Sequence, residues 1–212
     1  MRLLLARHGE STWNAEGRYQ GRRDAPLSER GKRQAAALAA ALSAQGALRP
    51  RTVVSSPLSR ARDTALASAR ALGLEVLLDE DLIEISHGSW EGLLVAEIEQ
   101  RWPEMYAQWR STPQTVRFPG GESIGDVVTR WRAFVSRVEQ HAAPVLVVTH
   151  DVIVRAAVMD ARRQPLSAFN TLRSENAAIT ELDWNGERLE LIRFNDAAHL
   201  GELRADPSAQ AL

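Results

Sequence analysis

The chain has 212 residues, of which 44% are hydrophobic and 25% charged, a composition typical of one globular domain with its own core. Its 26 basic residues nearly balance its 27 acidic ones, which excludes a nucleic-acid-binding module built on a strongly basic surface. The absence of cysteine excludes thiol nucleophiles, disulfide scaffolds and thiolate-bound zinc. No apolar segment is long enough for a signal peptide or a membrane span, so we expect a cytoplasmic protein that binds neither membrane nor nucleic acid.

The first half of the chain alternates short apolar runs with amphipathic segments. Leu3 to Ala6, Val53-Val54 and Glu75 to Leu78 are typical of buried strands. Between them, one helix is predicted to begin after Ser28, a good N-cap residue, and a second is predicted over 59–72. Strands that alternate with helices indicate an α/β fold with a mostly parallel sheet.

The stretch 82–120 interrupts this alternation, since it contains three tryptophans, Pro103 and few strand signals. We predict a helical excursion that covers the functional site of a single domain spanning 1–212. Trp102 and Trp109 are seven residues apart and are predicted to share one helix face, either in the core or as a wall over the site.

The next segments predict a long helix and a buried strand. Ser123 and Asp126 resemble a capping box for a helix that runs to about His141. Pro144 to Thr149 is the clearest buried strand of the chain, and a further helix is predicted over 152–161.

The chain is predicted to end in an antiparallel hairpin. Segments 179–184 and 189–194 flank Asn185-Gly186, a strong hairpin signal, and residues 205–212 are expected to fray. The predicted architecture is an α/β three-layer sandwich, in which helices flank a mostly parallel central sheet and the hairpin is added late.

Polar side chains follow four of the predicted strands. They are Arg7 and His8 after the first strand, Ser55, Ser56 and Arg60 after the second, Glu84 after the third, and His150 and Asp151 after the strand 144–149. The carboxyl ends of parallel strands meet at one edge of a sheet, where ligands bind. Arginine binds phosphate bidentately, histidine can be a covalent nucleophile, and a glutamate beside phosphate has the raised pKa of a general acid. Because the sequence has no P-loop and no acidic cluster at metal-ligand spacing, these residues predict phosphoryl chemistry without a metal.

The order and content of these segments resemble the histidine phosphatase superfamily, in its phosphoglycerate-mutase-like branch. The matching segments are Arg7 to Asn14 with Gln20-Gly21, Leu27 to Gly31, Ser55 to Ala65, Glu84 to Gly92, Gly120 to Ser123, and Val147 to His150. Together they extend over nearly the whole chain, from Arg2 to Phe194.

The resemblance implies a role for each matching residue. His8 would be the nucleophile that becomes phosphohistidine, and Glu84 would protonate the leaving oxygen and then activate the hydrolytic water. The other implied roles are phosphoryl binding by Arg7, Arg60 and His150, phosphate contact by Asn14, and a substrate-side lining of Gln20 and Gly21. No metal or organic cofactor is expected. The expected ligand is a small phosphorylated metabolite, and a homodimer is the expected oligomer because twofold dimers are the commonest assemblies.

Two residues depart from the family pattern. Asp151 stands where glycine commonly follows the second histidine, either as the N-cap of the next helix or as a substrate-binding residue for a hydroxyl or amine near the phosphate. Ile83 stands where arginine often precedes the acid, which changes how Glu84 is supported.

Several residues near these motifs allow two interpretations. His87, His199, Arg22 and Arg117 are either substrate contacts or residues of the surrounding structure, and the sequence leaves open whether the segment with His199 closes over the site. Glu10 and Glu91 are predicted to be loop and surface residues, and Trp90 a packing residue.

The favoured function is a phosphatase that hydrolyses small phosphomonoesters. One alternative is a phosphoglycerate mutase, but the segment Leu82 to Gly88 differs from the Leu-Asn-Glu-Arg-His-Tyr-Gly typical of cofactor-dependent mutases. An alternative of another class is a non-catalytic phospho-ligand-binding or regulatory protein on the same fold. The presence of all five reactive side chains favours an enzyme, and the substrate stays open.

Overall fold

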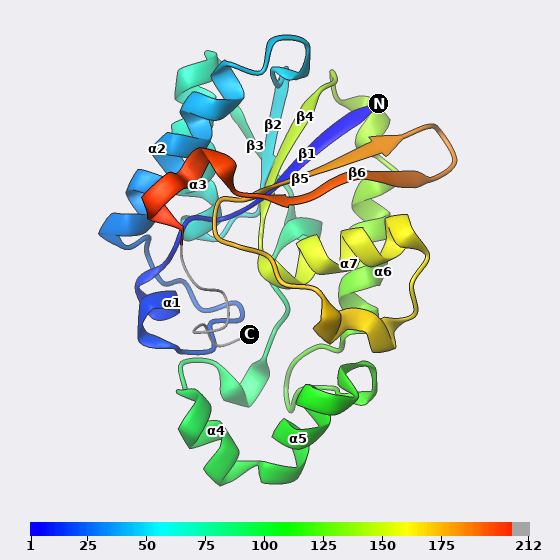
Figure 1. The fold of residues 1–212 in the computed structure, drawn as a ribbon. Helices are drawn as coiled ribbons and strands as arrows, with labels where there is room; N and C mark the ends of the chain where they lie inside the picture. The colour runs from blue at the N-terminus through cyan, green and yellow to red at the C-terminus, as the bar shows by residue number, and fades with distance from the viewer. Residues whose placement is uncertain (205–212) are drawn as a thin grey trace.

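The structure, a computed structural model, describes residues 1–204, and in this part of the chain it shows a six-stranded mixed sheet (Figure 1). The strands are β1 (Arg2–Arg7), β2 (Thr52–Ser55), β3 (Val76–Leu78), β4 (Val145–Thr149), β5 (Ile179–Trp184) and β6 (Leu189–Asp196). Their order is β3-β2-β4-β1-β5-β6; the first four in this order are parallel, whereas β5 and β6 pair antiparallel with their neighbours. The predicted sheet and late hairpin are confirmed. The tail predicted over 205–212 lies outside the described residues.

Helices form a layer on each face of this sheet. The α-helices of residues 1–204 are α1 (Thr12–Glu16), α2 (Glu29–Ser43), α3 (Ser59–Leu72), α4 (Val95–Arg101), α5 (Pro103–Ser111), α6 (Ile124–Val135) and α7 (Asp151–Arg162), and four of them form these layers. Helices α2 and α3 cover one face and α6 and α7 the other, which confirms the three layers (Figure 1). Within residues 1–204, no helix is both long enough and apolar enough to cross a bilayer.

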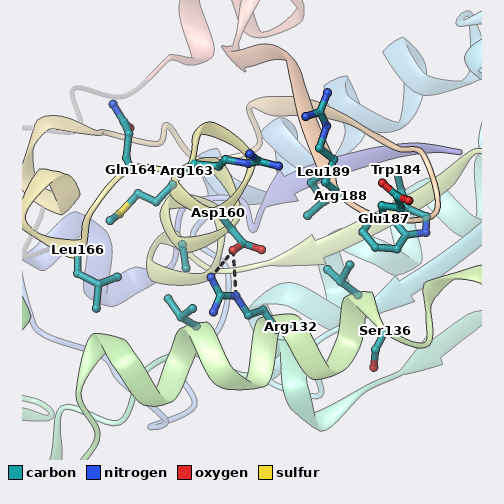
Figure 2. Close-up of a pocket in the computed structure, with 14 residues that line it drawn as sticks. Arg132, Ser136, Asp160, Arg163, Gln164, Leu166, Trp184, Glu187, Arg188 and Leu189 are labelled. Atoms are coloured by element: carbon teal, nitrogen blue, oxygen red, sulfur yellow. Dashed lines mark hydrogen bonds and ion pairs between the residues drawn. The ribbon is translucent and has the colours of Figure 1, made fainter.

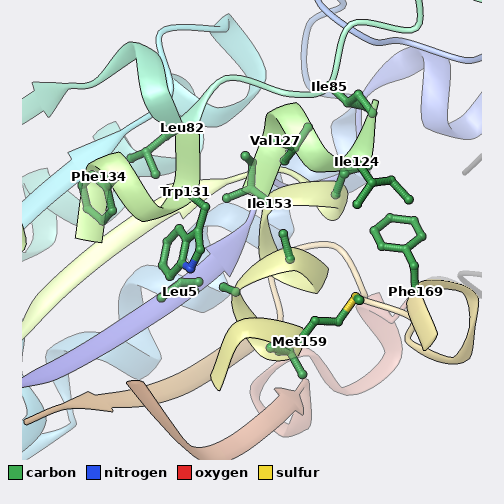
Figure 3. Close-up of a cluster of buried hydrophobic side chains, with 14 of the residues drawn as sticks. Leu5, Leu82, Ile85, Ile124, Val127, Trp131, Phe134, Ile153, Met159 and Phe169 are labelled. Atoms are coloured by element: carbon green, nitrogen blue, oxygen red, sulfur yellow. The ribbon is translucent and has the colours of Figure 1, made fainter. Parts of the chain in front are cut away.

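Strand β1 is buried on both faces, as its continuous apolar run predicts. Leu3 and Leu5 pack into the cluster formed with α6 and α7, whereas Leu4 and Ala6 pack into the cluster under α2 and α3. Trp131 projects from α6 into the first cluster (Figure 3). Full burial of one large apolar side chain contributes about 1.5–3 kcal/mol, so packing on both sides holds the strand and the loop after it in place.

The helix predicted from Ser123 to about His141 begins as expected but ends early. Ser123 and Asp126 form the capping box, yet α6 ends at Val135 and only a short 3-10 turn follows over 138–140. The hydroxyl of Ser136 donates to the Ala133 carbonyl. The side chain of Arg137 forms ion pairs with two aspartates that follow β3. These side-chain hydrogen bonds compete with continuation of the helical ladder, so the predicted end at His141 is wrong.

The excursion predicted over 82–120 is helical, but its two tryptophans do not share a helix. Trp102 lies at the junction of α4 and α5, because Pro103 has no N–H with which to continue α4 and instead begins α5. Trp109, in α5, is buried against Phe118 and Phe169. Figure 1 shows α4 and α5 beyond the carboxyl ends of the parallel strands. The prediction of a single helix face is therefore wrong.

Candidate functional site

A small cavity lies at the carboxyl ends of the parallel strands. It is lined by Arg7, His8, Asn14, Gln20, Gly21, Arg60, Glu84, His87, Asp151 and Val152. The structure thus brings together the predicted site residues from four separate strand ends. His150 is the exception, since it is not part of this lining, but its ring centroid lies 5.1 Å from that of His8.

The loop after β1 fixes both the position and the tautomer of His8. Its Nδ1 lies 2.7 Å from the carbonyl oxygen of Gly9, which can only accept, so Nδ1 carries the proton and Nε2 the lone pair. A Cβ added at Gly9 would lie 2.5 Å from the Gly31 carbonyl oxygen, so glycine is required where this loop meets the first turn of α2. Burial, reinforced by Arg60 and then Arg7, holds the pKa of His8 well below its usual range and keeps the ring neutral.

Two buried arginines meet the histidine from different elements. Arg60, in the first turn of α3, donates from Nε to His8 Nε2 at 3.3 Å, and its other nitrogens donate to the carbonyls of Arg23 and Gly21. Arg7 donates from Nη1 to the Ser174 carbonyl at 2.6 Å. These bonds to neutral carbonyls fix the direction of each guanidinium, whose positive charge and planar set of donors suit a dianionic ligand.

His150 is held by a serine that directly follows the neighbouring strand β2. Its Nε2 lies 2.7 Å from Ser56 Oγ, while Nδ1 has no hydrogen-bond partner within residues 1–204. Burial, followed by the charge of Arg60, keeps the pKa of His150 well below its usual range. The predicted phosphoryl contact of His150 stays a prediction.

Glu84 is a buried carboxyl at the side of the cavity formed by the loop after β3. Burial, followed by the negative charge of Asp151, raises its pKa from 4.5 to about 7, although the Ile85 N–H and the two arginines oppose the shift. A carboxyl with this pKa is protonated in about half of the molecules near neutral pH, which suits an acid that also acts as a base.

The loop that carries Glu84 is supported from α6 and not by its own preceding side chain. Arg130 donates from Nη1 to the carbonyls of Asp81 and Ile83, both at 2.9 Å. Arg130 also donates to both carboxylate oxygens of Glu122, and Oε2 of this glutamate accepts from the Ser86 N–H as well. Ile83 is apolar and cannot provide a positive charge next to the acid. Arg130, which lies on α6 about 46 positions after Glu84, provides the cationic support of the loop instead.

The substrate-side residues are positioned by the loop around α1. Asn14 Oδ1 accepts from the Ser11 N–H, which fixes the amide so that Nδ2 is left without a hydrogen-bond partner among the described residues. Gln20 accepts from the Ser11 hydroxyl at 2.7 Å. The Gly21 carbonyl accepts from Arg60 Nη2, so Gly21 helps to hold this arginine in place.

Asp151 does not cap the helix that follows it, so that interpretation is wrong. It is the first residue of α7, the N-cap position belongs to His150, and the side chain of Asp151 accepts from Arg155 Nη1 at 2.9 Å. Its other oxygen lies 4.0 Å from Arg7 Nη1, and the carboxylate lines the cavity. The carboxylate pairs with an arginine four residues later on the same helix, and in this conformation it does not cap the helix.

Other candidate residues divide between the cavity and its surroundings. His87 lines the cavity, whereas Arg22 and Arg117 form exposed ion pairs with acidic residues outside it. His199 contacts the Ala177 carbonyl in a turn that packs against α2. In the described part of the chain, the segment with His199 therefore does not line the cavity.

The prediction of a surface position is wrong for Glu10. Glu10 is buried, accepts from the hydroxyl of Ser28 and pairs with Arg30, and so joins the loop after β1 to the start of α2. Glu91 is half-buried and accepts from two backbone N–H groups of neighbouring loops. Both glutamates are structural parts of the loops around the site.

Sequence reasoning missed several residues that hold the reactive groups. Asn176 donates to the carbonyl of His8 at 3.0 Å, and Thr64 accepts from the Gly9 N–H at 3.0 Å. Arg155 fixes one oxygen of Asp151. Thr64 and Arg155 are four residues after Arg60 and Asp151 on buried helix faces, which was an available signal, whereas nothing in the sequence pointed to Asn176.

A larger pocket lies elsewhere, between α6, α7 and the β5–β6 hairpin (Figure 2). Its lining is mainly apolar, and the ion pair of Arg132 with Asp160 crosses it. It contains no histidine and none of the residues that the sequence singles out. Within residues 1–204, no group of three histidine or acidic side chains is arranged to hold a metal ion in either pocket or elsewhere.

Comparisons with known proteins agree with this geometry. Residues 3–197 match the sequence model of the histidine phosphatase superfamily, branch 1. The chain is 40% identical over 204 residues to phosphoserine phosphatase 1 of Hydrogenobacter thermophilus, covering 95% of each chain. It is 35% identical over 205 residues to the metal-independent phosphoserine phosphatase of Arabidopsis thaliana, covering 95% of this chain and 84% of that one.

A solved structure is similar in both fold and sequence. The structure of mycobacterial glucosyl-3-phosphoglycerate phosphatase with VO3 has a TM-score of 0.83 and 34% identity, covering 92% of this chain and 99% of that one. The chain therefore belongs to the histidine phosphatase superfamily, branch 1. The class of protein that the fold and the site define is a small-molecule phosphatase of this superfamily.

Proposed function

We propose that this phosphatase hydrolyses small phosphomonoesters in two steps through a phosphohistidine on His8. The observation that carries the proposal is the neutral His8 ring, whose Nε2 lone pair lies in one cavity with two buried arginines and a carboxyl of pKa about 7. Nucleophile, anion-binding groups and proton donor are the parts that phosphoryl transfer to a histidine needs.

In the first step, the Nε2 lone pair of His8 attacks phosphorus, and the bond from phosphorus to the ester oxygen breaks. Glu84 gives its proton to that oxygen, so the alcohol leaves in neutral form. Arg7 and Arg60 bind the phosphoryl oxygens, and the unpartnered Nδ2 of Asn14 is a further donor to them.

In the second step, the Glu84 carboxylate takes a proton from water, and the water oxygen attacks phosphorus. The bond between phosphorus and Nε2 breaks, its electron pair returns to His8, and inorganic phosphate leaves. Glu84 is protonated again, so both groups are ready for the next ester. The Gly9 carbonyl accepts from Nδ1 throughout and stabilises the charge that develops on the ring.

The test is phosphate release from a panel of small phosphomonoesters with EDTA present, combined with trapping of an acid-labile phosphoenzyme. We expect metal-independent release and a phosphoenzyme that is absent from His8→Asn. Interconversion of 2- and 3-phosphoglycerate without phosphate release, in the presence of 2,3-bisphosphoglycerate, would show a mutase instead. Neither turnover nor phosphoenzyme would show a non-catalytic phospho-ligand-binding protein.

We also propose, from the sequence, a cytoplasmic location and a homodimer that binds small phosphorylated metabolites and neither nucleic acid nor membrane. The near balance of charge supports the exclusion of nucleic acid. Light scattering coupled to size-exclusion chromatography tests the dimer, and a mass of about 23.4 kDa would show a monomer.

A further inference from the structure

Asp151 has one engaged and one unengaged carboxylate oxygen. Oδ2 accepts from Arg155 Nη1 at 2.9 Å, but no donor of the described residues is within hydrogen-bond distance of Oδ1. Oδ1 lies 4.0 Å from Arg7 Nη1, and the side chain is only 1% exposed. A buried charged acceptor without a donor is unfavourable, so this oxygen is a place where a ligand gains by supplying one.

The surrounding residues prevent Arg155 from serving both oxygens. Its Nη2 donates to the Phe169 carbonyl at 2.7 Å and to Asn170 Oδ1 at 3.1 Å, and its guanidinium lies 3.5 Å from the Phe169 ring centroid. The arginine is thereby fixed on the Oδ2 side. Oδ1 is the oxygen nearer to Arg7, which lines the cavity together with Asp151.

Asp151 also lies near the groups that face the leaving alcohol. Its charge acts on Glu84 and on His87, which line the cavity with it, as well as on Arg7. In the proposed function Glu84 protonates the ester oxygen, so a group close to both Arg7 and Glu84 lies where the phosphoryl group joins its alcohol.

A carboxylate at this place opposes binding of a phosphoryl dianion unless the ligand also carries a positive charge. Arg7 and Arg60 match the two charges of the phosphoryl group, and Arg155 is bound on the far side of Asp151. An alcohol without a cation leaves Oδ1 without a hydrogen-bond donor. A protonated amine forms a charge-assisted hydrogen bond with Oδ1 and removes the repulsion.

We propose that Asp151 is a specificity-determining residue whose Oδ1 binds a protonated amine on the leaving alcohol. The substrate class is then the phosphate esters of amino alcohols. This inference rests on the proposed hydrolysis at His8 and names the substrates that the same site selects.

Matched substrate pairs test the proposal on the unmodified protein. O-phosphoserine and 3-phosphoglycerate differ only by an ammonium group in place of a hydroxyl, and so do O-phosphoethanolamine and 2-hydroxyethyl phosphate. We expect kcat/KM to favour the amine in each pair by about 10- to 100-fold, the range of a charge-assisted hydrogen bond. Equal values, or preference for the hydroxyl, would overturn the role of Asp151 while hydrolysis stands. No release from any of the four, together with no phosphoenzyme, would overturn both.

Asp151→Asn removes the charge and keeps the shape of the side chain. We expect the ratio of kcat/KM within each pair to fall to about one, mainly through loss of the amine substrate. Asp160→Asn, on the same helix but in the other pocket, is the control and should keep the ratio of the unmodified protein. Because the ratio is taken within one preparation, changes in the shared phosphoryl chemistry cancel.

An equal loss for both members of a pair would show that Asp151 only supports the structure, and would overturn the proposal. Asp151→Thr, with a smaller neutral side chain, repeats the measurement if the asparagine variant does not fold. The comparison on the unmodified protein does not depend on either variant.

Discussion

The two pockets differ in how deeply their charged groups are buried and how these groups are paired. In the pocket beside the β5–β6 hairpin, Arg132 pairs with Asp160 at 2.7 Å, and the arginine side chain is 66% exposed. At the carboxyl ends of the parallel strands, His8, Arg60 and Glu84 are buried and have displaced pKa values. Buried charge is costly unless it is paired, so its concentration in one cavity marks the place where a ligand completes the pairing. Volume alone would have selected the other pocket.

The largest expected effect is the loss of the nucleophile. His8→Asn removes the Nε2 lone pair, so turnover should fall by at least about 10⁴-fold while the fold stays intact. His141→Asn, after the 3-10 turn that follows α6, is the matched control and should retain full turnover. Steady-state kinetics with circular dichroism separates the two results. Substantial activity in His8→Asn would show that the assignment of the nucleophile is wrong.

The planar guanidinium of Arg60, with its several donors, should contribute more to kcat/KM than its positive charge alone. Arg60→Lys keeps a cation but loses the simultaneous contacts to His8 Nε2 and two carbonyls, so we expect kcat/KM to fall by about 10³-fold. Arg132→Lys makes the same change in the other pocket and should leave kcat/KM unchanged. If the two lysine variants behaved alike, the distinction between the pockets would not hold.

Glu84→Gln should lower kcat/KM for alkyl phosphates by about 10²-fold, because the leaving alkoxide loses its proton donor. For p-nitrophenyl phosphate, whose leaving group needs no proton, the loss should be much smaller. The acid must be protonated in the first step, so kcat/KM of the unmodified protein should decline as the pH rises above about 7. A pH profile that keeps this decline in Glu84→Gln would assign it to another group.

The same carboxyl predicts the sign of a stability effect. Its pKa is raised from 4.5 to about 7 in the folded state, so the folded state binds more protons than the unfolded state between these values. Relative to Glu84→Gln, the free energy of unfolding should therefore decrease as the pH rises from 4.5 to about 7, by at most about 1.4 kcal/mol per pH unit. Urea titrations of both proteins across this range measure the difference, and a parallel pair of curves would contradict it.

The smallest effect is expected from the exposed ion pair. Asp160→Asn breaks the contact with Arg132, but exposure of the arginine screens the interaction, so the free energy of unfolding should change by at most about 1 kcal/mol. Turnover should not change. A loss of activity above a few-fold would indicate that the pocket beside the hairpin communicates with the site.

The sheet was predictable because its signals are local. The apolar run before Arg7 and the Asn185-Gly186 turn each identify an element without reference to the rest of the chain. The end of α6 was not predictable in this way, because it depends on Arg137 reaching aspartates near β3. The break at Trp102 was visible in the following proline, which a seven-residue spacing should not have outweighed.

The site shows the same division between local and distant causes. Convergence of the strand ends brought His8, Arg60 and Glu84 to one cavity, as the sequence predicts. The pairing of Asp151 with Arg155 was not predicted, because an aspartate at the start of a helix is typical both of a cap and of an ion pair with an arginine four positions later. Asn176 and Arg130 reach the site from distant elements, and only the folded arrangement reveals them.

The contact between Gly9 and Gly31 also limits how such a chain can vary. A Cβ at Gly31 would lie 1.9 Å from the Glu10 carbonyl oxygen, so backbone meets backbone from both sides. Neither glycine offers a functional group, yet a side chain at either position displaces the loop that carries the reactive histidine. Selection for activity would therefore hold both positions to glycine as strictly as it holds the chemistry, and a library randomised at both should return glycine at each.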